Sequence, residues 1–429
     1  QRQARAIAKA AILKEAPARA TTQSIDRIVL HPVAGPIILA ALLFVMFQAV
    51  FAWATPFADG LDAGVSAIHD AALAALPPGI FRSFVADGLI AGVGAVIVFL
   101  PQILILFAFI LVLETTGYMV RAAFLMDRLM AGVGLSGRAF IPLLSSFACA
   151  VPGIMATRTI EDPKDRLTTI LIAPLMTCSA RLPVYAVIIA AFIPARNVLP
   201  GIGLQGLVLF GLYLGGIVGA LVAALALRRT VTKGRGMGFM MEMPRYQMPI
   251  LKNLLLGLWQ RAWVFLKRAG TIIAVTTMIL WALLNFPRVD PASGVSQVDH
   301  SIAGHIANGL AVVVEPIGFN RDISLALIPA MAAREVAVSA LATTYAIDNQ
   351  DESKRDQTLG ERLKGSWSLP TALAFLVWFV FAPQCISTIA VVRRETNGWR
   401  WPLFMVAYLF ALAYVAAGAT FWLATYLGL

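Results

Sequence analysis

Three cysteines lie in segments that are otherwise apolar enough to enter a bilayer, and each is close to a proline: Cys149, Cys178 and Cys385. Thiolate and thioether sulfur select transition metals over Mg²⁺ or Ca²⁺, so these residues could bind such an ion. A free cysteine is also among the most often buried residues, and a small packing residue is the alternative. The odd number, with none in an outside loop, argues against a disulfide scaffold.

Polar side chains accompany two of the cysteines. The stretch APLMTCSARLPVY (173–185) surrounds Cys178 with a methionine, two hydroxyls and an arginine, and CIST (385–388) places two hydroxyls after Cys385. A transport site must bind an ion firmly enough to replace its water and weakly enough to release it, and a few thiols and hydroxyls suit this task. The further candidates along an ion path are Met176, Thr177, Ser179 and Ser387.

Four charged residues in or beside apolar segments are also candidates, because intramembrane ionisable residues are usually functional. We expect Glu335 on the path, with its neighbour Arg334 as an ion-pairing residue at the same gate. Arg181 either pairs similarly or caps free carbonyls of a broken helix. Glu114 ends a long apolar run, and it is either an interfacial carboxylate, a cation relay, or a partner for Arg121 or Arg181.

The composition predicts the kind of element that positions these residues. Hydrophobic residues make up 59% of the 429 residues and charged residues 13%, whereas a soluble protein carries about a quarter charged residues. Because a spanning helix needs about 20 mostly apolar residues, the chain is predicted to be an all-α polytopic membrane protein. The candidate spans are 32–54, 88–119, 167–194, 203–227, 270–286, 370–391 and 401–427. Pro, Gly or charge interrupts two further apolar stretches, 139–157 and 322–346.

The distribution of charge predicts the orientation. Residues 228–268 hold nine Lys/Arg and one acid, and residues 1–31 hold six Lys/Arg and two acids. The segments 54–86 and 287–321 carry more acids than bases. By the positive-inside rule, 1–31 and 228–268 are cytoplasmic, and the net charge of +11 then needs no nucleic-acid partner.

Two cytoplasmic segments must be separated by an even number of membrane crossings, but five apolar stretches lie between them. One of the five must therefore turn back without crossing, and the interrupted stretch 139–157 fits best. The same count makes 322–346 re-entrant, with 347–369 as an outside loop. Each re-entrant segment is followed by two spans, and one lone span between the copies inverts the second. Inverted repeats with broken helices are typical of secondary transporters, so the fold class is an inverted repeat of two gate units.

The expected organisation has five parts. A cytoplasmic helical linker at 1–31 is followed by N-terminal spans at 32–138, which include an outside amphipathic helix at 60–76. A first gate repeat follows at 139–227. The segment 228–286 contains a basic linker, an amphipathic helix (250–268) and a connecting span, and a second gate repeat occupies 322–429. The modest expectation for Pro101 is a kink in its helix.

Several chemistries are excluded. The sequence has no GxxxxGK[ST], and GRGMGF (234–239) without a preceding strand is too weak for a nucleotide site. The four histidines fall outside the predicted spans, so no imidazole accompanies a cysteine as in a thiol hydrolase. We therefore expect no enzymatic activity from this chain.

The same segments resemble a known family. GLSGRAFIPLLSSFACAVPGIMATRTIEDPKDRLTTILIAPLMTCSARLPVYAVII (134–189) is similar to the first gate motif of the bacterial ferrous iron transport protein B family. ALIPAMAAREVAVSAL (326–341) with FAPQCISTIAVVRRE (381–395) is similar to its second gate motif. The stretches 98–130 and 253–273 also match its pattern, and the resemblance covers 24–427. The family's gate cysteines fall on the three cysteines of this chain, although FACAVP has alanines where Gly and Asn commonly flank the cysteine.

The resemblance implies uptake of Fe²⁺ across the bacterial inner membrane, with the N-terminus in the cytoplasm. It also implies an N-terminal GTPase domain, joined near residue 24 and absent from this sequence, through which GTP and Mg²⁺ would act. Small cytosolic Feo proteins and the lipid bilayer are the implied partners, together with a homo-oligomer whose size the sequence leaves open. The alternatives are a nucleoside or other small-solute transporter on the same repeat plan, and a membrane scaffold without transport.

Overall fold

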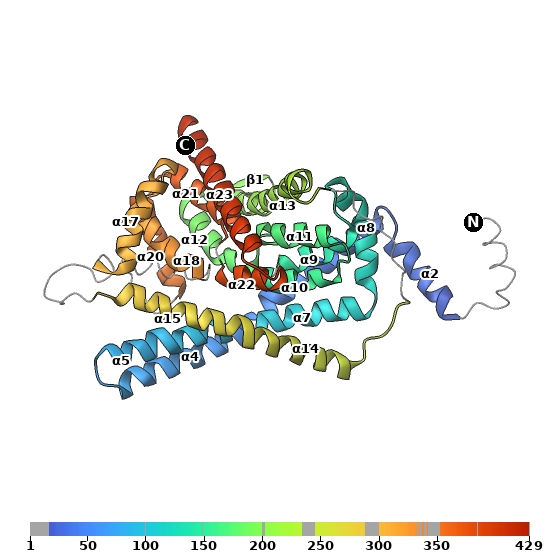
Figure 1. The fold of residues 1–429 in the computed structure, drawn as a ribbon, viewed down its shortest axis with the longest axis horizontal. Coiled ribbons are helices and arrows are strands. Elements are labelled where there is room, and N and C mark those ends of the chain that lie inside the picture. Colours follow the sequence, from blue (N-terminus) through green and yellow to red (C-terminus); the bar gives the residue numbers. More distant parts are fainter. Residues whose placement is uncertain are drawn as a thin grey trace.

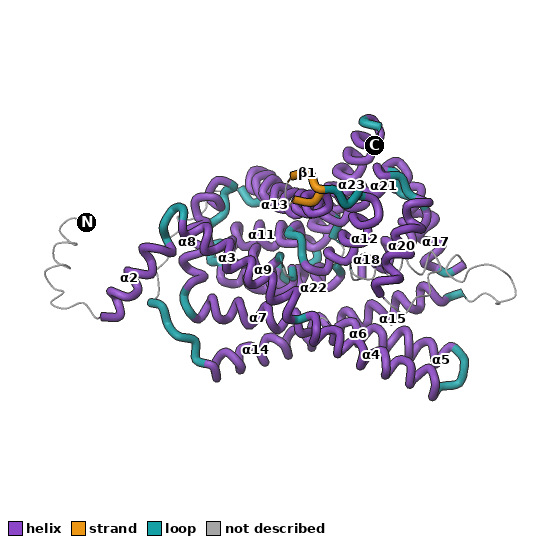
Figure 2. The backbone as a smooth tube through the Cα atoms, turned by 180° about the vertical axis from the view of Figure 1, so that it is seen from behind, coloured by secondary structure: helices purple, strands orange, loops and turns teal. Residues whose placement is uncertain are grey.

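The computed structural model describes residues 17–98, 100–147, 149–199, 202–233, 245–287, 300–332, 334, 337–338, 341, 352–383 and 385–428. Helices make up nearly all of this part of the chain, as the purple tube in Figure 2 shows. The exception is one short antiparallel pair, β1 (Asn197–Leu199) with β2 (Ile202–Gly203). The prediction of an all-α polytopic membrane protein is confirmed.

The N-terminal region and the linker extend from the right-hand side of Figure 1 along the bottom of the molecule. Their elements are α2 (Pro17–Val29), α3 (Ala34–Gln48), η1 (Ala49–Trp53), α4 (Thr55–Ala75), α5 (Ile80–Ser83), η2 (Phe84–Ile90), α6 (Ala91–Val98), α7 (Leu100–Thr115), α8 (Tyr118–Gly132), α14 (Leu251–Phe265), η7 (Leu266–Gly270) and α15 (Thr271–Asn285). The helix from Ile80 to Thr115 has 36 residues and continues through Pro101. The kink expected at Pro101 therefore does not divide it into two spans. α14 carries Trp259 and Trp263 on its exposed side, as expected of an interfacial helix.

The first gate region begins with a hairpin of two short helices and ends with a long one. Its elements are η3 (Gly137–Ala139), α9 (Phe140–Ser146), α10 (Ala150–Ala156), η4 (Thr157–Thr159), α11 (Pro163–Ile172), η5 (Ala173–Leu175), η6 (Ser179–Arg181), α12 (Leu182–Phe192) and α13 (Leu204–Thr230). α11 and α12 belong to the predicted span 167–194, which is broken at 173–181. Pro174 and Pro183, each near the start of a helical turn, explain why one straight helix does not form here.

The second gate region repeats this order. It follows α17 (Ile302–Val314) and η9 (Glu315–Ile317), and its elements are α18 (Arg321–Ala332), α20 (Glu352–Ser366), α21 (Leu369–Phe381), α22 (Ile386–Glu395) and α23 (Arg400–Tyr426). The predicted span 370–391 is broken at 382–385, next to Pro383. α13 and α23, the long helices that end the two regions, both have 27 residues.

One expectation about this region was wrong. The segment 347–369 was predicted to be an outside loop, but residues 352–366 form α20. Leu359 and Leu363 are buried in the core of the second region, next to α12. Two leucines in an otherwise polar helix give too weak an apolar pattern to predict that packing.

Each gate region is preceded by the same sharp bend. α8 turns by 111° into α9, and α17 with η9 turns by 111° into α18. Both bends use a glycine with positive φ, Gly134 at 80° and Gly318 at 82°. In each, the next residue's N–H reaches back five residues, from Leu135 to the Met130 carbonyl and from Phe319 to the Val314 carbonyl. This is a Schellman cap, which satisfies orphan carbonyls and ends the helix.

The described residues contain four helices long and apolar enough to span a membrane, or seven if each bent pair counts as one span. The four are Ile80–Thr115, Leu204–Thr230, Leu369–Glu395 and Arg400–Tyr426. The bends of 111° directly precede the segments 139–157 and 322–346, whose re-entrant course stays a prediction. The chain is therefore a multi-pass membrane protein.

Two large cores occupy the gate regions, and each takes elements from both. The first core contains α12 together with α18, α20 and α21. The second contains α9, α10, α11 and α13 together with α22 and the start of α23. Each broken span therefore begins in the core of its own region and ends in the other core. Its break lies where one core gives way to the other.

Candidate ion path between the two cores

Cys178 and Cys385 lie in the two breaks between these cores, and Cys149 packs against the second core. Cys149 precedes α10 and Cys385 precedes α22, both in extended backbone conformations, with φ and ψ of −154° and 130° for Cys149 and −164° and 106° for Cys385. Cys178 lies between η5 and η6. All three are reduced and half-buried. The first N–H groups of a helix and its dipole favour negative charge, so α10 and α22 each present a favourable end to a thiolate.

Cys178 is in contact with a residue of the other gate region. The Nη1 of Arg334 donates to the Cys178 Sγ at 3.6 Å, and its Nη2 donates to the Ala382 carbonyl at 3.5 Å. The Arg334 side chain is buried, and it lies within electrostatic range of Arg181 and Cys385. One guanidinium therefore links the two breaks.

Arg181 satisfies backbone groups that the first break leaves free. Its Nη2 donates to the Pro174 carbonyl at 3.0 Å, and its Nη1 donates to Thr177 Oγ1 at 3.4 Å. The Tyr408 hydroxyl donates to the nearby Leu171 carbonyl. Irregular backbone at membrane depth requires such partners. Arg181 is completely buried, so it also adds a second positive charge near Cys178.

The other predicted ligands are placed unevenly. Met176 and Thr177 are buried at the first break, and Thr177 lies against α13, where Gly216 leaves room for this close approach. Ser387 is buried in the first turn of α22, and its Oγ has no hydrogen-bond partner. The N–H of Thr388 donates to the Cys385 carbonyl at 3.1 Å. Glu335 and the side chain of Ser179 lie outside the described residues.

The described residues include no group of three or more His, Cys, Asp or Glu side chains that could hold a metal ion together. Two buried guanidinium groups beside Cys178 would also repel a divalent cation. In this conformation Cys178 is therefore bonded to a guanidinium rather than held in a formed metal site. Binding of a dication there requires at least Arg334 to move.

Glu114 has a partner that the sequence did not indicate. Its Oε2 accepts a bond of 2.8 Å from Arg261 Nη2 on α14, and both side chains are partly exposed. The expectation that Arg121 might pair with Glu114 was wrong. Arg121 is fully buried and pairs with Asp26 of α2 at 2.9 Å, while the ring of Tyr246 stacks on its guanidinium at 4.1 Å.

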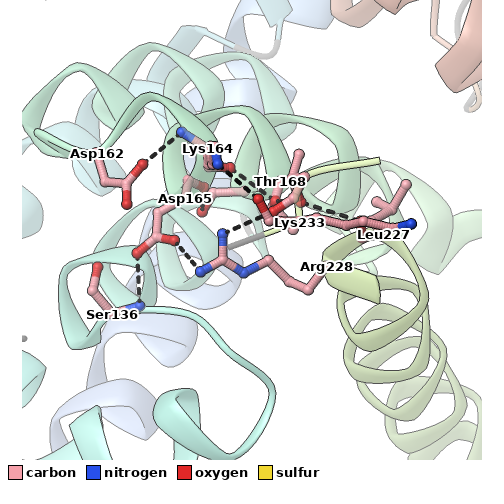
Figure 3. Close-up of polar contacts among 10 residues, drawn as sticks. Ser136, Asp162, Lys164, Asp165, Thr168, Leu227, Arg228 and Lys233 are labelled. Atoms are coloured by element: carbon pink, nitrogen blue, oxygen red, sulfur yellow. Dashed lines mark hydrogen bonds and ion pairs between the residues drawn. The ribbon is translucent and has the colours of Figure 1, made fainter. Parts of the chain in front are cut away.

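Figure 3 shows a buried ion pair that sequence reasoning missed, at the end of α13. Arg228 Nη2 lies 2.8 Å from Asp165 Oδ1, with the side chains 6% and 1% exposed. The Ser136 N–H donates to the other carboxylate oxygen at 3.2 Å. Asp165 lies just outside the predicted span 167–194, and burial raises the pKa of its carboxyl while Arg228 opposes that change. The motif PKDR (163–166), directly before that span, was the available signal.

A second missed group joins the two gate regions on the same side of the molecule. Glu395, the last residue of α22, accepts bonds from Arg158 at 2.6 and 2.9 Å and from Arg166 at 2.8 Å. Its carboxylate is only 3% exposed. The sequence RRE (393–395) contains two arginines beside one acid, and it is the acid whose side chain is buried.

Comparison with known proteins identifies the family of the chain. The family described as "Gate: Nucleoside recognition" matches residues 96–192 and 266–399, which is more than half of the chain. "Ferrous iron transport protein B C terminus" matches residues 209–261. No solved structure matches the chain. The chain belongs to the Gate family of membrane proteins.

Within that family, the chain corresponds to the membrane portion of ferrous iron transport protein B. It is 42% identical over 403 residues to the "Fe(2+) transporter FeoB" of Leptospira interrogans, covering 91% of this chain and 58% of that protein. It is 38% identical over 400 residues to the protein of the same name in Staphylococcus aureus, covering 91% and 57%. A protein of Porphyromonas gingivalis named "Fe(2+) transport protein A/Fe(2+) transporter FeoB fusion protein" is 37% identical over 435 residues, covering 92% and 51%. The chain thus spans less than two thirds of the length of these relatives.

Proposed function

We propose that this chain forms the ion path of a permease that moves ferrous iron into the bacterial cytoplasm. The observation that carries the proposal is the position of the two broken spans. Both breaks lie where the two cores meet, and each break contains a cysteine that could replace water on Fe²⁺. The relatives' printed names identify them as Fe(2+) transporters.

In this proposal the ion binds in turn to Cys385, Cys178 and Cys149, with help from the hydroxyls of Thr177, Ser179 and Ser387, from the Met176 sulfur and from Glu335. Arg334 and Arg181 occupy the site in the closed state. Because Arg334 donates to both Cys178 and Ala382, its departure would free the thiol and loosen the second break together. The ion leaves past Glu114 and the basic surface.

The wider arrangement follows from charge and from the relatives. The N-terminus and residues 228–268 lie in the cytoplasm, and the protein is in the inner membrane. The gate repeats are 139–227 and 322–429, with 1–31 linking to an N-terminal GTPase domain through which GTP and Mg²⁺ act. The fusion relative suggests a small Feo protein as partner. A homo-oligomer is compatible with the exposed apolar faces of the spans.

A nucleoside transporter on the same plan is the competing function. It would use amide and carboxylate side chains at both breaks to bind a ribose and a base. The described part of the breaks offers thiols, hydroxyls and two arginines instead. Iron therefore fits the chemistry better.

Anaerobic Fe²⁺ uptake by cells that carry the protein with its complete N-terminal region tests the proposal. Cys178→Ser and Cys385→Ser should each reduce uptake by at least about tenfold, because a neutral hydroxyl binds a borderline metal much more weakly than a thiolate. Cys149→Ser, at a thiol packed in the second core, should have a smaller effect. Unchanged uptake in both of the first two variants, at equal protein level, would contradict the proposal.

A further inference from the structure

The carboxylate of Glu395 is held by two arginines from the opposite gate region. Arg158 binds both oxygens, with Nη2–Oε1 at 2.6 Å and Nε–Oε2 at 2.9 Å, and Arg166 Nη2 lies 2.8 Å from Oε2. The arginines are 53% and 32% exposed, whereas the carboxylate between them is nearly inaccessible. Bidentate pairs of this kind are among the strongest protein hydrogen bonds and fix the relative orientation of the two groups.

These contacts join the two halves of the gate. Arg158 belongs to η4, directly after α10, and Arg166 belongs to α11, so both are in the first region. Glu395 ends α22 in the second region. The other buried ion pair on this side, Asp165 with Arg228, lies within the first region.

The same two helices carry thiols at their other ends. Cys149 caps the start of α10, and Cys385 caps the start of α22. The two helices pack against one another. From Cys385 to Glu395 the chain runs through the ten residues of α22, and from Cys149 to Arg158 it runs through the seven residues of α10 and into the short 3₁₀ turn η4. Each path is roughly 15 Å of helical chain. Separating Arg158 from Glu395 would therefore move the ends that hold Cys149 and Cys385.

We propose that Glu395 with Arg158 and Arg166 forms a latch that holds the two gate regions together and so closes the ion path on the side of the molecule where these residues lie. When the latch opens, α10 and α22 transmit the movement to Cys149 and Cys385. The inference rests on the proposed function, because it assigns a gate to the same path. The three charged residues are positioning residues, since they act on the path through the helices rather than by touching the ion. The latch opens only when the two gate regions separate on this side.

Thiol labelling of the purified full chain in nanodiscs, without iron, tests the latch. The probe is N-ethylmaleimide, and mass spectrometry of the peptides gives a separate rate for each cysteine. Glu395→Gln keeps the shape of the side chain and removes its charge, so labelling of Cys149 and Cys385 should accelerate by about fivefold or more as the open population rises. Glu395→Asp should restore rates close to those of the original protein.

Glu161→Gln is the matched control. Glu161 is an acid on the same side that pairs with one arginine, Arg138, and its side chain is 73% exposed. Its loss should leave all labelling rates within about twofold, because an exposed pair contributes little. If Glu395→Gln fails to fold, Arg158→Gln and Arg166→Gln serve instead, since each leaves one arginine on the carboxylate and should give an intermediate acceleration.

Folded variants that label Cys149 and Cys385 at the original rates would overturn the latch. Unfolding alone would expose Cys178 equally and would change the circular dichroism spectrum, which separates it from opening. The assay needs no iron, so it is independent of the uptake test. Faster labelling in Glu395→Gln, together with unchanged uptake in Cys178→Ser and Cys385→Ser, would support the latch and reject the iron path. Unchanged labelling in Glu395→Gln, together with reduced uptake in the cysteine variants, would reject the latch and support the iron path.

Discussion

The two gate regions share one order of elements but hold their long helices in place by different chemistry. In the first, the bend at Gly134 lies against Arg228 near the end of α13, and Arg228 is paired with Asp165. In the second, the bend at Gly318 lies against the ring of Phe421 near the end of α23. The same joint is ionic in one copy and apolar in the other.

The difference agrees with an inverted arrangement. If the copies have opposite orientations, the first joint is at the cytoplasmic face, where lysine and arginine accumulate, and the second is at the outer face. Around the second joint the polar groups of aromatic residues bond backbone instead, with Tyr414 donating to the Val313 carbonyl and Trp422 to the Pro316 carbonyl. Tyrosine and tryptophan are typical of membrane interfaces. The proposed inverted orientation would account for this difference between the two joints.

Removing one charge from the ionic joint should give the largest effect. Asp165→Asn leaves the Arg228 guanidinium buried without its counter-charge, so the free energy of unfolding should fall by about 3–5 kcal/mol. The double variant Asp165→Asn with Arg228→Met replaces the ionic joint by an apolar one and should recover most of that loss. Denaturation in detergent, followed by circular dichroism, measures both.

A double variant as unstable as Asp165→Asn alone would mean that the joint needs its charges. The first copy could then not use the apolar chemistry of the second, and the comparison between the joints would fail.

Substitution of the two bend glycines tests the comparison at a single position in each copy. A Cβ on Gly318 would lie 2.1 Å from the Phe421 ring, whereas a Cβ on Gly134 would lie 3.3 Å from the flexible end of Arg228. Both variants incur about 1–2 kcal/mol for an L residue at positive φ. Gly318→Ala also overpacks the joint, so it should cost about 2 kcal/mol more than Gly134→Ala.

The same denaturation assay applies, with Phe421→Leu as the second change. That substitution makes room, so it should reduce the cost of Gly318→Ala and leave that of Gly134→Ala unchanged. Equal costs in the two glycine variants would show that the joints tolerate a side chain alike.

The sequence was sufficient to predict the helical class and the long helices at 203–227 and 401–427, because apolar length is a local signal. The bends at Gly134 and Gly318 were missed although each is a glycine followed by an apolar residue, which is the usual pattern of a Schellman cap. The 111° turns show that the repeated unit extends back to α8 and α17.

Much of the site could not be predicted, because its contacts are long-range. Glu395 binds arginines 229 and 237 residues earlier in the chain, and no local pattern encodes such a pair. The pairing of Arg334 with Glu335 stays a prediction, because Glu335 lies outside the described residues, whereas the contact of Arg334 with Cys178, 156 residues away, was not predicted. Residue types alone indicated a thiol site, and the fold placed two guanidinium groups in it.

The smallest predicted effect concerns the two buried arginines, Arg334 and Arg181, that bond to groups at the breaks. Arg334 reaches across from the second region to Cys178, whereas Arg181 bonds backbone of its own region. Arg334→Gln keeps a donor for the Ala382 carbonyl but removes the charge beside the thiol, so Co²⁺ should bind about tenfold more tightly, equivalent to about 1.4 kcal/mol. Arg181→Gln removes a donor from a carbonyl with few other partners and should lower stability without a comparable gain in affinity. Anaerobic titration with Co²⁺, followed by the thiolate-to-metal charge-transfer band in the near ultraviolet, measures the affinity. Equal affinities in Arg334→Gln and the original protein would show that Arg334 does not compete with the metal, and the asymmetry between the breaks would then be structural only.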